Sequence, residues 1–548
     1  MNAQTFEPVL PTVFEEEGDG ALPGALTVCL VTEGTYPYYV GGVSTWCDLL
    51  IKGLPEVHFV LMSLVADPGA RPVFELAPNV IKLIPVPLWG ISEVLELERH
   101  LSFWQIIRRK RSAPISAIQS VFLPIFQRFL NALWSQTAPP EAFGQALLDM
   151  KSYFEHHDYD VTMRSFPVWE CFLEESRQGY QRFWEPFGLE RSATLLDATE
   201  AMRLLYRWLT VLTVEFPQVD VMHSAAAGLC SIPGILARQR YGTPFLLTEH
   251  GVYLRERLLA LVRSKMSLFD QTFQALFAQR LTEASYFFAD QIAPGSNYNQ
   301  RWEIHNGAKP ERIQTIYNGP DPAEFTPLDR HRPPDAPATI VWLGRIDPLK
   351  DLHTLIRAAA IVHQEMPSVR FVLYGKAPKG NEAYYEQCLA LRDELGLRDV
   401  VIFAGFAASA EAAYNEGDFV ILSSVSEGFP YSMVEAMMCG RTVVGTAVGG
   451  VPEALDGCGI IVEPRNPVEM AAACLRLLRN PELTRELGRK ARERAIARFS
   501  LQQCNASYLA TYQRLAMLAR SRGIPRGEAT PLWQSDIRER PTLESLRA

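Results

Sequence analysis

Short apolar runs and helical segments alternate in two successive series along this chain, and this alternation limits its fold more than any other feature. The first series has strand-like runs at 26–32, 57–64, 80–84, 219–223, 244–248, 286–289 and 313–317. The second has them at 339–343, 369–374, 400–403, 419–422, 442–445 and 460–462, with helical segments such as 352–365 and 384–395 between them. Strands that alternate with helices form parallel sheets covered by helices on both faces. The sequence therefore predicts an α/β fold with two doubly wound, Rossmann-like domains that face each other across a cleft.

Composition along the chain sets the expected domain boundaries. The first domain is predicted at 25–330, and within it strand signals vanish at about 88–215. There Trp and Phe recur at helical intervals, which indicates a helical insertion. A proline-rich linker at 332–337 leads into a second domain, predicted at 338–498. A helix expected at 499–520 returns to pack on the first domain.

Charge, cysteine usage and hydropathy narrow the class of protein. A net charge of −9 argues against a general nucleic-acid binder. The nine cysteines are scattered and form no CxxC pair, which indicates buried free thiols in a reducing compartment. No apolar run is long enough to cross a bilayer and the first basic residue is Lys52, so we expect a cytoplasmic protein without a standard signal peptide. The acidic residues 1–24 are expected to be a flexible lead-in, and residues 521–548 a loosely ordered tail.

The stretch from Asp418 to Gly440 has the clearest chemical content. Its pattern predicts a buried strand, then a polar loop containing Glu427, and then a helix that carries Glu435. The start of a helix is a ready anion site, because its backbone donors have no partner. The two carboxylates on either side of that site could accept hydrogen bonds from the hydroxyls of a sugar and a ribose. The alternative is that one glutamate caps the helix and the other lies in solvent.

A second loop follows the strand at 339–343 and carries two cations, Arg345 and Lys350. Two cations on a strand-to-helix loop suit a diphosphate and would neutralise a departing nucleoside diphosphate without a metal. The alternative is a pair of surface cations, one of them paired with Asp347 or Asp351.

Two first-domain features could approach a bound nucleotide. Gly41 and Gly42 lie between the first strand and its helix, where paired glycines let the backbone come close to a phosphate. They could equally form a tight turn. Asn318, near the end of the domain, precedes a glycine, and this pair alone signals only a turn.

A histidine and two arginines follow the strand at 244–248. His250 could hydrogen-bond a substrate hydroxyl or its own neighbours. Arg255 and Arg257 could bind an anion, or form ion pairs with Glu256.

In their order, these motifs resemble those of the GT-B glycosyltransferases of family 4. The matching positions are Gly41-Gly42, His250, Asn318 to Phe325, Arg345 with Lys350, Glu427 with Glu435, and Gly449 to Glu453. The resemblance covers about 26 to 520. Within the family the chain is most similar to the PelF-type exopolysaccharide (Pel) transferases, through Glu33 to Pro37, the helical insertion and Thr248 to Arg257. It departs from the family at Tyr374 to Lys376, where a more acidic or glycine-rich loop is expected.

The resemblance implies a GT-B fold and a retaining, metal-independent transfer of a hexose from a UDP-sugar, with UDP-glucose as the leading candidate. The acceptor is then a growing exopolysaccharide or another glycan, and the partner a membrane-bound polysaccharide synthase or export complex at the inner membrane face. The implied catalytic residues are His250, Glu427, Arg345 and Lys350. The implied nucleotide-sugar contacts are Gly41, Gly42, Asn318, Gly428, Phe429, Pro430, Tyr431 and Glu435. Alternatives are a GT-B epimerase or phosphorylase, or a degenerate scaffold subunit of an export complex.

One segment of the insertion points to an interaction surface. From Leu101 to Arg111 an aromatic, apolar stretch directly precedes four consecutive cations. Such a segment can lie on an anionic membrane surface or bind a partner. The alternative is a helix packed on the first domain through Phe103, Trp104 and Ile107, with its cations in solvent.

Overall fold

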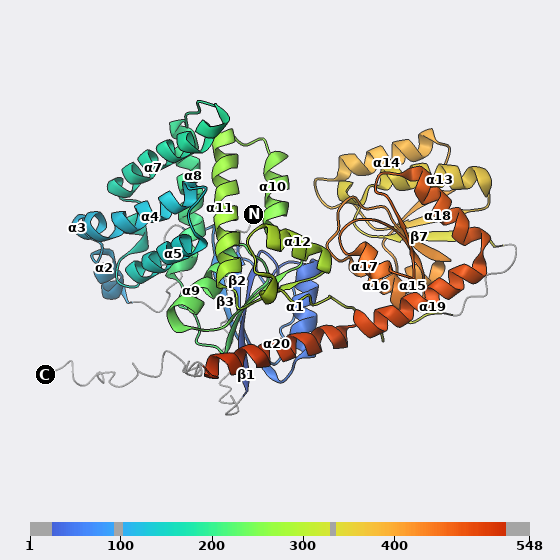
Figure 1. Cartoon of the computed structure of the whole chain (residues 1–548), viewed down its shortest axis with the longest axis horizontal. Helices are drawn as coiled ribbons and strands as arrows, with labels where there is room; N and C mark the ends of the chain where they lie inside the picture. The colour runs from blue at the N-terminus through green and yellow to red at the C-terminus, as the bar shows by residue number, and fades with distance from the viewer. Residues whose placement is uncertain (1–24, 92–101, 329–335, 522–548) are drawn as a thin grey trace, which may run out of the picture.

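The computed structural model describes residues 25–91, 102–328 and 336–521. These residues form two parallel six-stranded sheets, each covered by helices on both faces, and the two domains lie side by side (Figure 1). The predicted α/β fold class is confirmed. The expected lead-in, most of the linker and the tail lie outside the described residues.

The first sheet has the strand order β3-β2-β1-β4-β5-β6. Its strands are β1 (Leu26–Glu33), β2 (Val57–Val65), β3 (Val80–Pro87), β4 (Val221–Ser224), β5 (Phe245–Glu249) and β6 (Gln291–Pro294). Outside the insertion, its helices are α1 (Gly42–Gly53), α9 (Ile232–Tyr241), α10 (Tyr253–Val262), α11 (Leu268–Phe288) and α12 (Asn297–His305), with short turns η5 (Leu229–Ser231) and η6 (Pro310–Arg312).

Two predicted strands of the first domain are wrong. Residues 286–288 form the end of α11, and the strand begins only at Gln291. Because α11 is buried on most of its faces, its apolar residues show no helical stripe and resemble a strand. Residues 313–317 contain no regular strand: they add only an isolated bridge between Ile292 and Ile313 and a few backbone hydrogen bonds beside β6.

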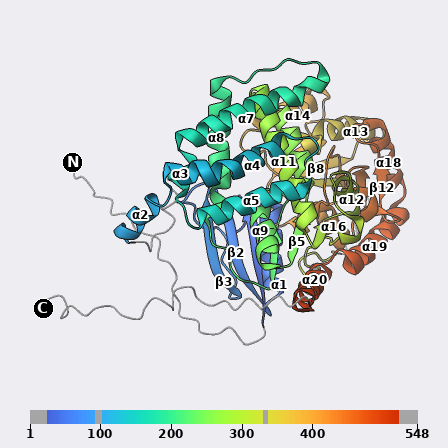
Figure 2. The same cartoon turned by 60° about the vertical axis from the view of Figure 1, so that its left-hand side comes forward.

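The segment between β3 and β4 is helical where it is described. Its helices are α2 (Phe103–Lys110), α3 (Ile115–Ala117), α4 (Leu123–Trp134), α5 (Pro140–Phe154), α6 (Tyr159–Met163), α7 (Phe166–Trp184) and α8 (Leu195–Trp208), with η2 (Ile118–Phe122), η3 (Glu185–Phe187) and η4 (Leu209–Thr213). They form a layer over α9 and α11, on the side of the first domain away from the second (Figures 1 and 2). Aromatic side chains fill the interface: the rings of Trp208 and Phe277 have centroids 4.5 Å apart.

The second sheet has the order β12-β11-β10-β7-β8-β9. Its strands are β7 (Thr339–Leu343), β8 (Arg370–Tyr374), β9 (Val401–Gly405), β10 (Phe419–Leu422), β11 (Val443–Thr446) and β12 (Ile460–Val462). Its helices are α13 (Leu352–Glu365), α14 (Glu382–Glu394), α15 (Ala410–Glu416), α16 (Tyr431–Met438), α17 (Val451–Leu455), α18 (Pro467–Arg479) and α19 (Pro481–Arg498), with the short turn η7 (Pro348–Lys350). The predicted bounds of β7, β10, β12 and α13 are confirmed.

The last described helix, α20 (Leu501–Ser521), runs from the second domain back across the first, where it contacts α1 and β1 (Figure 1). It supplies Tyr512, whose hydroxyl lies 2.7 Å from Nδ1 of His223. Thr248 lies 2.8 Å from the other ring nitrogen, so this buried histidine has a structural role in the described fold. Burial lowers the pKa of His223 to about 3.

All nine cysteines are free and buried, as expected. Among the described helices, none is long and apolar enough to cross a membrane.

Candidate active site

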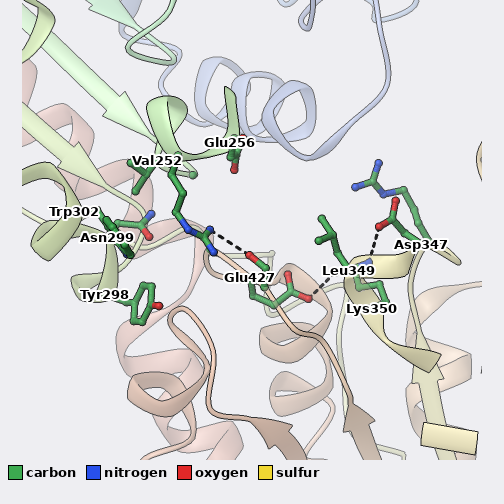
Figure 3. A pocket seen from close by; sticks show the side chains of 14 residues that line it. Val252, Glu256, Tyr298, Asn299, Trp302, Asp347, Leu349, Lys350 and Glu427 are labelled. Atoms are coloured by element: carbon green, nitrogen blue, oxygen red, sulfur yellow. Dashed lines mark hydrogen bonds and ion pairs between the residues drawn. The ribbon is translucent and has the colours of Figure 1, made fainter. Parts of the chain in front are cut away.

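A cleft of about 180 Å³ lies between the two domains, beyond the carboxyl ends of strands from both sheets. The first domain contributes the loop after β5 and the helices α10 and α12. The second domain contributes the loops that follow β7 and β10. Figure 3 shows Val252, Glu256, Tyr298, Asn299 and Trp302 on one side of Glu427, and Asp347, Leu349 and Lys350 on the other.

The second-domain wall is built around an ion pair between Lys350 and Glu427. The Lys350 ammonium lies 2.6 Å from Oε1 of Glu427, and the two side chains are 21% and 10% exposed. Ser424 donates a second hydrogen bond of 2.5 Å to the same oxygen. The alternative in which one of the two cations pairs with Asp347 or Asp351 is wrong: Lys350 contacts Glu427, and Arg345 has no ion-pair partner among the described residues.

Hydrogen bonds between the two loops fix this ion pair in place. The backbone N–H of Val425 donates to the Leu349 carbonyl at 2.8 Å. The hydroxyl of Ser423 donates to the Lys350 carbonyl at 2.7 Å. Asp347 holds the turn by accepting from the Leu349 N–H at 2.9 Å. These hydrogen bonds join the two loops and hold the charged side chains of the wall in one arrangement.

Arg345 lies on the same wall and lines the cleft with an exposed side chain. Within the described residues its guanidinium has no hydrogen-bond or ion-pair partner. Its donors are therefore available to an anion beside Lys350.

Glu435 is placed differently from Glu427. It lies on α16, outside the residues that line the cleft, and its carboxylate accepts a 2.7 Å hydrogen bond from the buried Tyr414 hydroxyl. Burial raises the pKa of Glu435. Neither glutamate caps α16: its N-cap is Pro430, and no side chain bonds the N-terminal donors.

The four residues from Gly428 to Tyr431 were predicted to contact the nucleotide-sugar, and only the first of them lines the cleft. Gly428 lines the cleft, close to the first domain: a Cβ there would lie 2.5 Å from the His250 carbonyl oxygen. Phe429 is buried, with its ring centroid 5.0 Å from that of Tyr317 and 5.1 Å from that of Phe499. Neither Pro430 nor Tyr431 is among the residues that line the cleft.

His250, directly after β5, presents one ring nitrogen without a partner. Its Nδ1 lies 3.1 Å from the Asn318 side-chain nitrogen. The imidazole ring packs edge-on against the Trp46 ring, with the two ring centroids 4.4 Å apart. Burial lowers the pKa of His250 to about 4, so the ring is neutral at pH 7. If Asn318 donates to Nδ1, the proton of the neutral ring lies on Nε2. Nε2 is buried and has no hydrogen-bond partner, and His250 is not among the residues that line the cleft.

The helix α12 supplies a part of the cleft that the sequence did not predict. Tyr298, Asn299 and Trp302 line the cleft, and Asn299 is only 4% exposed. Its side-chain nitrogen is buried without a hydrogen-bond partner. The sequence did contain a signal for this helix, because polar and aromatic residues follow directly after β6. The prediction missed it because it placed that strand at 286–289, about five residues too early.

A hydrogen bond crosses the cleft between the two domains. The Arg255 guanidinium, on α10, donates to the Ser426 hydroxyl at 3.2 Å. Arg257 instead donates to Gln274 on α11 at 3.0 Å. The sequence supported the same prediction for both arginines, but Arg255 contacts the second domain whereas Arg257 contacts a helix of its own domain.

A second contact between the domains involves Glu453, in the first turn of α17. Its carboxylate accepts from the Asn297 N–H at 3.0 Å, at the start of α12, and from the Tyr317 hydroxyl at 3.1 Å. A carboxylate at a helix N-terminus is stabilising. Glu453 thus joins the second domain to the helix that lines the first-domain wall.

Gly41 and Gly42 lie at the exposed start of α1, outside the residues that line the cleft. Gly41 is extended, with φ 176°, and a Cβ at either position would meet no atom within 4 Å. The packing of the protein itself therefore does not require glycine here.

Two buried carboxyl groups lie behind the first-domain wall. Glu249, at the end of β5, accepts a 2.5 Å hydrogen bond from Tyr286, whereas Glu303 of α12 is 0% exposed and neither of its oxygens has a partner. Burial, and then mutual repulsion for Glu303, raises the pKa of both groups above the ordinary carboxyl range. The described residues contain no group of three or more His, Cys, Asp or Glu side chains that could hold a metal ion.

Two parallel-sheet domains with a charged site between their strand ends define the GT-B class of fold. The family model described as "Domain of unknown function (DUF3492)" matches residues 26–311, and the one described as "Glycosyl transferases group 1" matches residues 337–480. The chain belongs to the first of these families, whose model covers more than half of it, and its second domain is similar to the group 1 glycosyl transferase domains.

Solved structures show the same fold at low sequence identity. Sucrose-phosphate synthase from Thermosynechococcus elongatus matches with a TM-score of 0.56 and 18% identity, over 90% of this chain and 100% of that one. HepE from Anabaena, in complex with UDP and glucose, matches with a TM-score of 0.53 and 17% identity, over 89% of this chain and 99% of that one.

Curated relatives match over part of their length. D-inositol 3-phosphate glycosyltransferase from Mycobacterium sp. (strain KMS) is 32% identical over 311 residues, which is 54% of this chain and 66% of the relative. The enzyme of the same name from Mycobacterium tuberculosis (strain F11) is 30% identical over 312 residues, which is 54% of this chain and 62% of the relative. The match thus spans slightly less than two thirds of these relatives.

Proposed function

We propose that this chain is a retaining glycosyltransferase that transfers a hexose from a UDP-sugar to a growing exopolysaccharide or another glycan. The observation that carries this proposal is the second-domain wall, where Lys350 is fixed by Glu427 and Arg345 lies unpaired beside it. A departing nucleoside diphosphate needs positive charge at its phosphates, and a fixed arrangement supplies that charge without reorganisation.

The residues of the cleft take distinct roles in this proposal. Arg345 and Lys350 stabilise the departing UDP. Glu427 accepts hydrogen bonds from hydroxyls of the donor hexose, and the Nε2 donor of His250 meets the sugar near its reacting carbon. Glu435, held by Tyr414, binds the ribose.

The remaining predicted contacts surround the nucleotide. When the cleft closes, Gly41 and Gly42 let the first-domain backbone reach the diphosphate. The loop from Gly428 to Tyr431 presents the uncapped N-terminus of α16 to the nucleotide, and Asn318 orients the ring of His250.

UDP-glucose is the leading donor candidate. The Anabaena protein with a similar fold was solved with UDP and glucose, and again with UDP-glucose. The acceptor follows from the resemblance to the PelF-type transferases, whose marks include Glu33 to Pro37 and the helical insertion. We place the enzyme on the cytoplasmic side of the membrane, where a membrane-bound synthase or export complex receives the polymer.

Donor binding is expected to need no divalent metal, because two cations of the chain face the diphosphate. A thermal-shift comparison of UDP-glucose, other UDP-hexoses and GDP-mannose, each with and without EDTA, tests this. A ligand present at about 100 times its dissociation constant stabilises the fold by roughly 2.7 kcal/mol. A shift with a UDP-sugar that survives EDTA is the expected result; a shift that EDTA abolishes contradicts the metal-free site.

Product analysis with a glycan acceptor present separates the reaction classes. Transfer with retained anomeric configuration, read by NMR, supports the proposal. Rearranged donor sugar identifies an epimerase, release of sugar phosphate identifies a phosphorylase, and no binding of any nucleotide identifies a scaffold subunit.

A further inference from the structure

Arg255 belongs to the first domain but makes its hydrogen bond with the second. It lies in the first turn of α10, lines the cleft, and donates to the Ser426 hydroxyl at 3.2 Å. Ser426 directly precedes Glu427, in the loop that forms the donor wall. The guanidinium is therefore positioned at that loop, with Arg345 and Lys350 lining the same cleft.

The surroundings of Arg255 orient its guanidinium and leave most of its donors available. The group lies over the Trp302 ring, 5.9 Å from the ring centroid. An arginine stacked on an aromatic ring keeps its edge free for planar, bidentate contacts. A guanidinium has five N–H donors, and one neutral hydroxyl is a modest partner for a full charge.

The nearby carboxylates are mostly engaged elsewhere. Glu427 is paired with Lys350, and Asp347 accepts from the Leu349 N–H and from Asn381. Glu256, beside Arg255 in the sequence, has a raised pKa through burial, which the positive charge of Arg255 partly offsets. The cleft therefore has positive charge on both of its walls.

We propose that Arg255 binds the diphosphate of the donor from the first-domain side, exchanging its bond to Ser426 for bonds to phosphate oxygens. This rests on the proposed function. Donor binding would then hold both walls together, because one anion would contact cations of both domains. Arg255 is thus a substrate-binding residue, and one that a nucleoside without phosphates would not use.

Isothermal titration of uridine, UMP and UDP into the full chain tests this proposal. We expect Arg255→Gln to weaken UDP binding roughly ten- to hundredfold, the range for a hydrogen-bonded charged group, and to leave uridine binding unchanged. Arg257→Gln is the matched control: it is two residues away on α10, bonded to Gln274, and should leave UDP affinity near that of the wild type. Arg255→Lys should lie between, since it keeps the charge and loses the bidentate geometry.

A second variant separates phosphate binding from a purely structural contact. If Arg255 only joined the domains through Ser426, Ser426→Ala would weaken UDP binding as much as Arg255→Gln does. We expect Ser426→Ala to keep wild-type affinity or to gain slightly. Equal losses in both variants overturn the proposal, as does unchanged UDP affinity in a folded Arg255→Gln protein. Failure of the wild type to bind UDP at all instead removes the proposed function, and this inference with it.

A separate observation concerns the surface of α2. Its first two residues, Phe103 and Trp104, are 67% and 76% exposed, so the expectation that they pack on the first domain is wrong. Arg109 anchors the other end of the helix through the Phe154 and Glu155 carbonyls, at 2.8 and 3.2 Å. The helix is fixed at its C-terminal end and projects its aromatic end outward, at the outer edge of the insertion (Figure 2).

Exposed cations accompany these aromatic residues. Arg108 and Arg111 are exposed near the end of the same helix. Aromatic side chains beside cations match an anionic bilayer surface, where the rings lie at the headgroups and each cation is attracted by the lipid charge. We infer that α2 docks the enzyme on an anionic membrane surface, with Phe103 and Trp104 inserted at the headgroups.

Co-sedimentation with vesicles tests this second inference. The full chain should pellet with phosphatidylcholine–phosphatidylglycerol vesicles and much less with pure phosphatidylcholine. Phe103→Ser combined with Trp104→Ser should abolish pelleting, and Arg108→Gln with Arg111→Gln should weaken it mainly at low salt, where the charges are least screened. Phe187→Ser is the control, because Phe187 is another exposed aromatic residue of the insertion. Negligible pelleting of the wild type overturns the inference, as does an equal loss in the control.

Discussion

The two walls of the cleft differ in how completely their buried polar groups are paired by hydrogen bonds. On the second-domain wall, Lys350 and Glu427 bond each other and Ser424 holds the carboxylate. On the first-domain wall, Asn299 Nδ2 is buried without a partner; the same holds for Nε2 of His250, which is not among the residues that line the cleft. A buried polar atom left unpaired costs about 1–3 kcal/mol. The buried polar groups of the second-domain wall are thus paired within the protein, whereas the first domain leaves these two buried atoms unpaired.

The largest effect is expected from Glu427→Gln, which breaks the preorganised wall. The change keeps the size of the side chain but removes the charge that pairs with Lys350. Hydrogen bonds to charged groups contribute about 1.5–3 kcal/mol, so we expect turnover to fall roughly ten- to hundredfold. Steady-state kinetics with a saturating acceptor measures the change. Glu427→Asp should recover part of the activity, and wild-type kinetics in the Gln variant would mean that the donor site lies elsewhere.

Glu435→Gln should have a smaller effect, and mainly on nucleotide binding. Its carboxylate lies outside the residues that line the cleft and is held by Tyr414. We expect UDP affinity to fall roughly tenfold with a lesser change in turnover, because the proposed hydrogen bond to a ribose hydroxyl loses its charged acceptor. Tyr414→Phe removes only the hydrogen bond from Tyr414 to Glu435 and should reduce the free energy of UDP binding by about 1 kcal/mol or less. Calorimetry of UDP binding measures both; a loss of turnover equal to that of Glu427→Gln contradicts the division of roles.

Asn299→Ala tests the unpaired amide of the first-domain wall. Since its amide nitrogen has no partner in the free protein, the change should leave the melting temperature nearly unaffected. We expect the KM for the acceptor to rise roughly fivefold, for one neutral hydrogen bond, with donor affinity unchanged. Gln300→Ala is the matched control, because that amide already bonds Asn297 and Thr315. A lower melting temperature for Asn299→Ala would indicate a structural role instead.

A different kind of effect is expected on the pH dependence of stability behind the first-domain wall. The pKa of Glu303 is raised in the folded state by burial and by Glu249, so the folded chain keeps a proton that the unfolded chain loses above about pH 4–5. Stability is therefore fully present at acidic pH and declines as pH rises through the neutral range. In Glu303→Gln this decline should be shallower. Melting temperatures between about pH 5 and about pH 9 test this; parallel curves for both proteins would contradict it.

The sequence predicted the second domain more accurately than the first. In the second domain, short apolar strands lie between clear turn signals, and β7, β10 and β12 begin and end where expected. In the first domain, α11 is packed on one side by the insertion and on the other by the sheet, so its last turn has the apolar character of a strand. The error shifted the following strand and hid the cleft residues of α12.

The residue types in the loops after the strands predicted the candidate site, but they did not predict which side chains bond each other. Loops after strands marked His250, Lys350 and Glu427, because parallel strands place their carboxyl ends at one edge of a sheet. Lys350 and Glu427 are 77 residues apart, and Arg255 and Ser426 are 171 apart and in different domains. No local pattern encodes which of several charged loops will meet.

The sequence by itself determined the two parallel-sheet domains, because the spacing of apolar residues directly reflects which faces are buried. It also determined which loops carry charge at the strand ends. Only the tertiary structure decided that Lys350 bonds Glu427 rather than a neighbouring aspartate, that Glu435 points to Tyr414, and that Arg255 crosses the cleft while Arg257 does not. These outcomes depend on how the domains pack against each other, and packing brings together side chains whose separation in the chain contains no information about their distance in space.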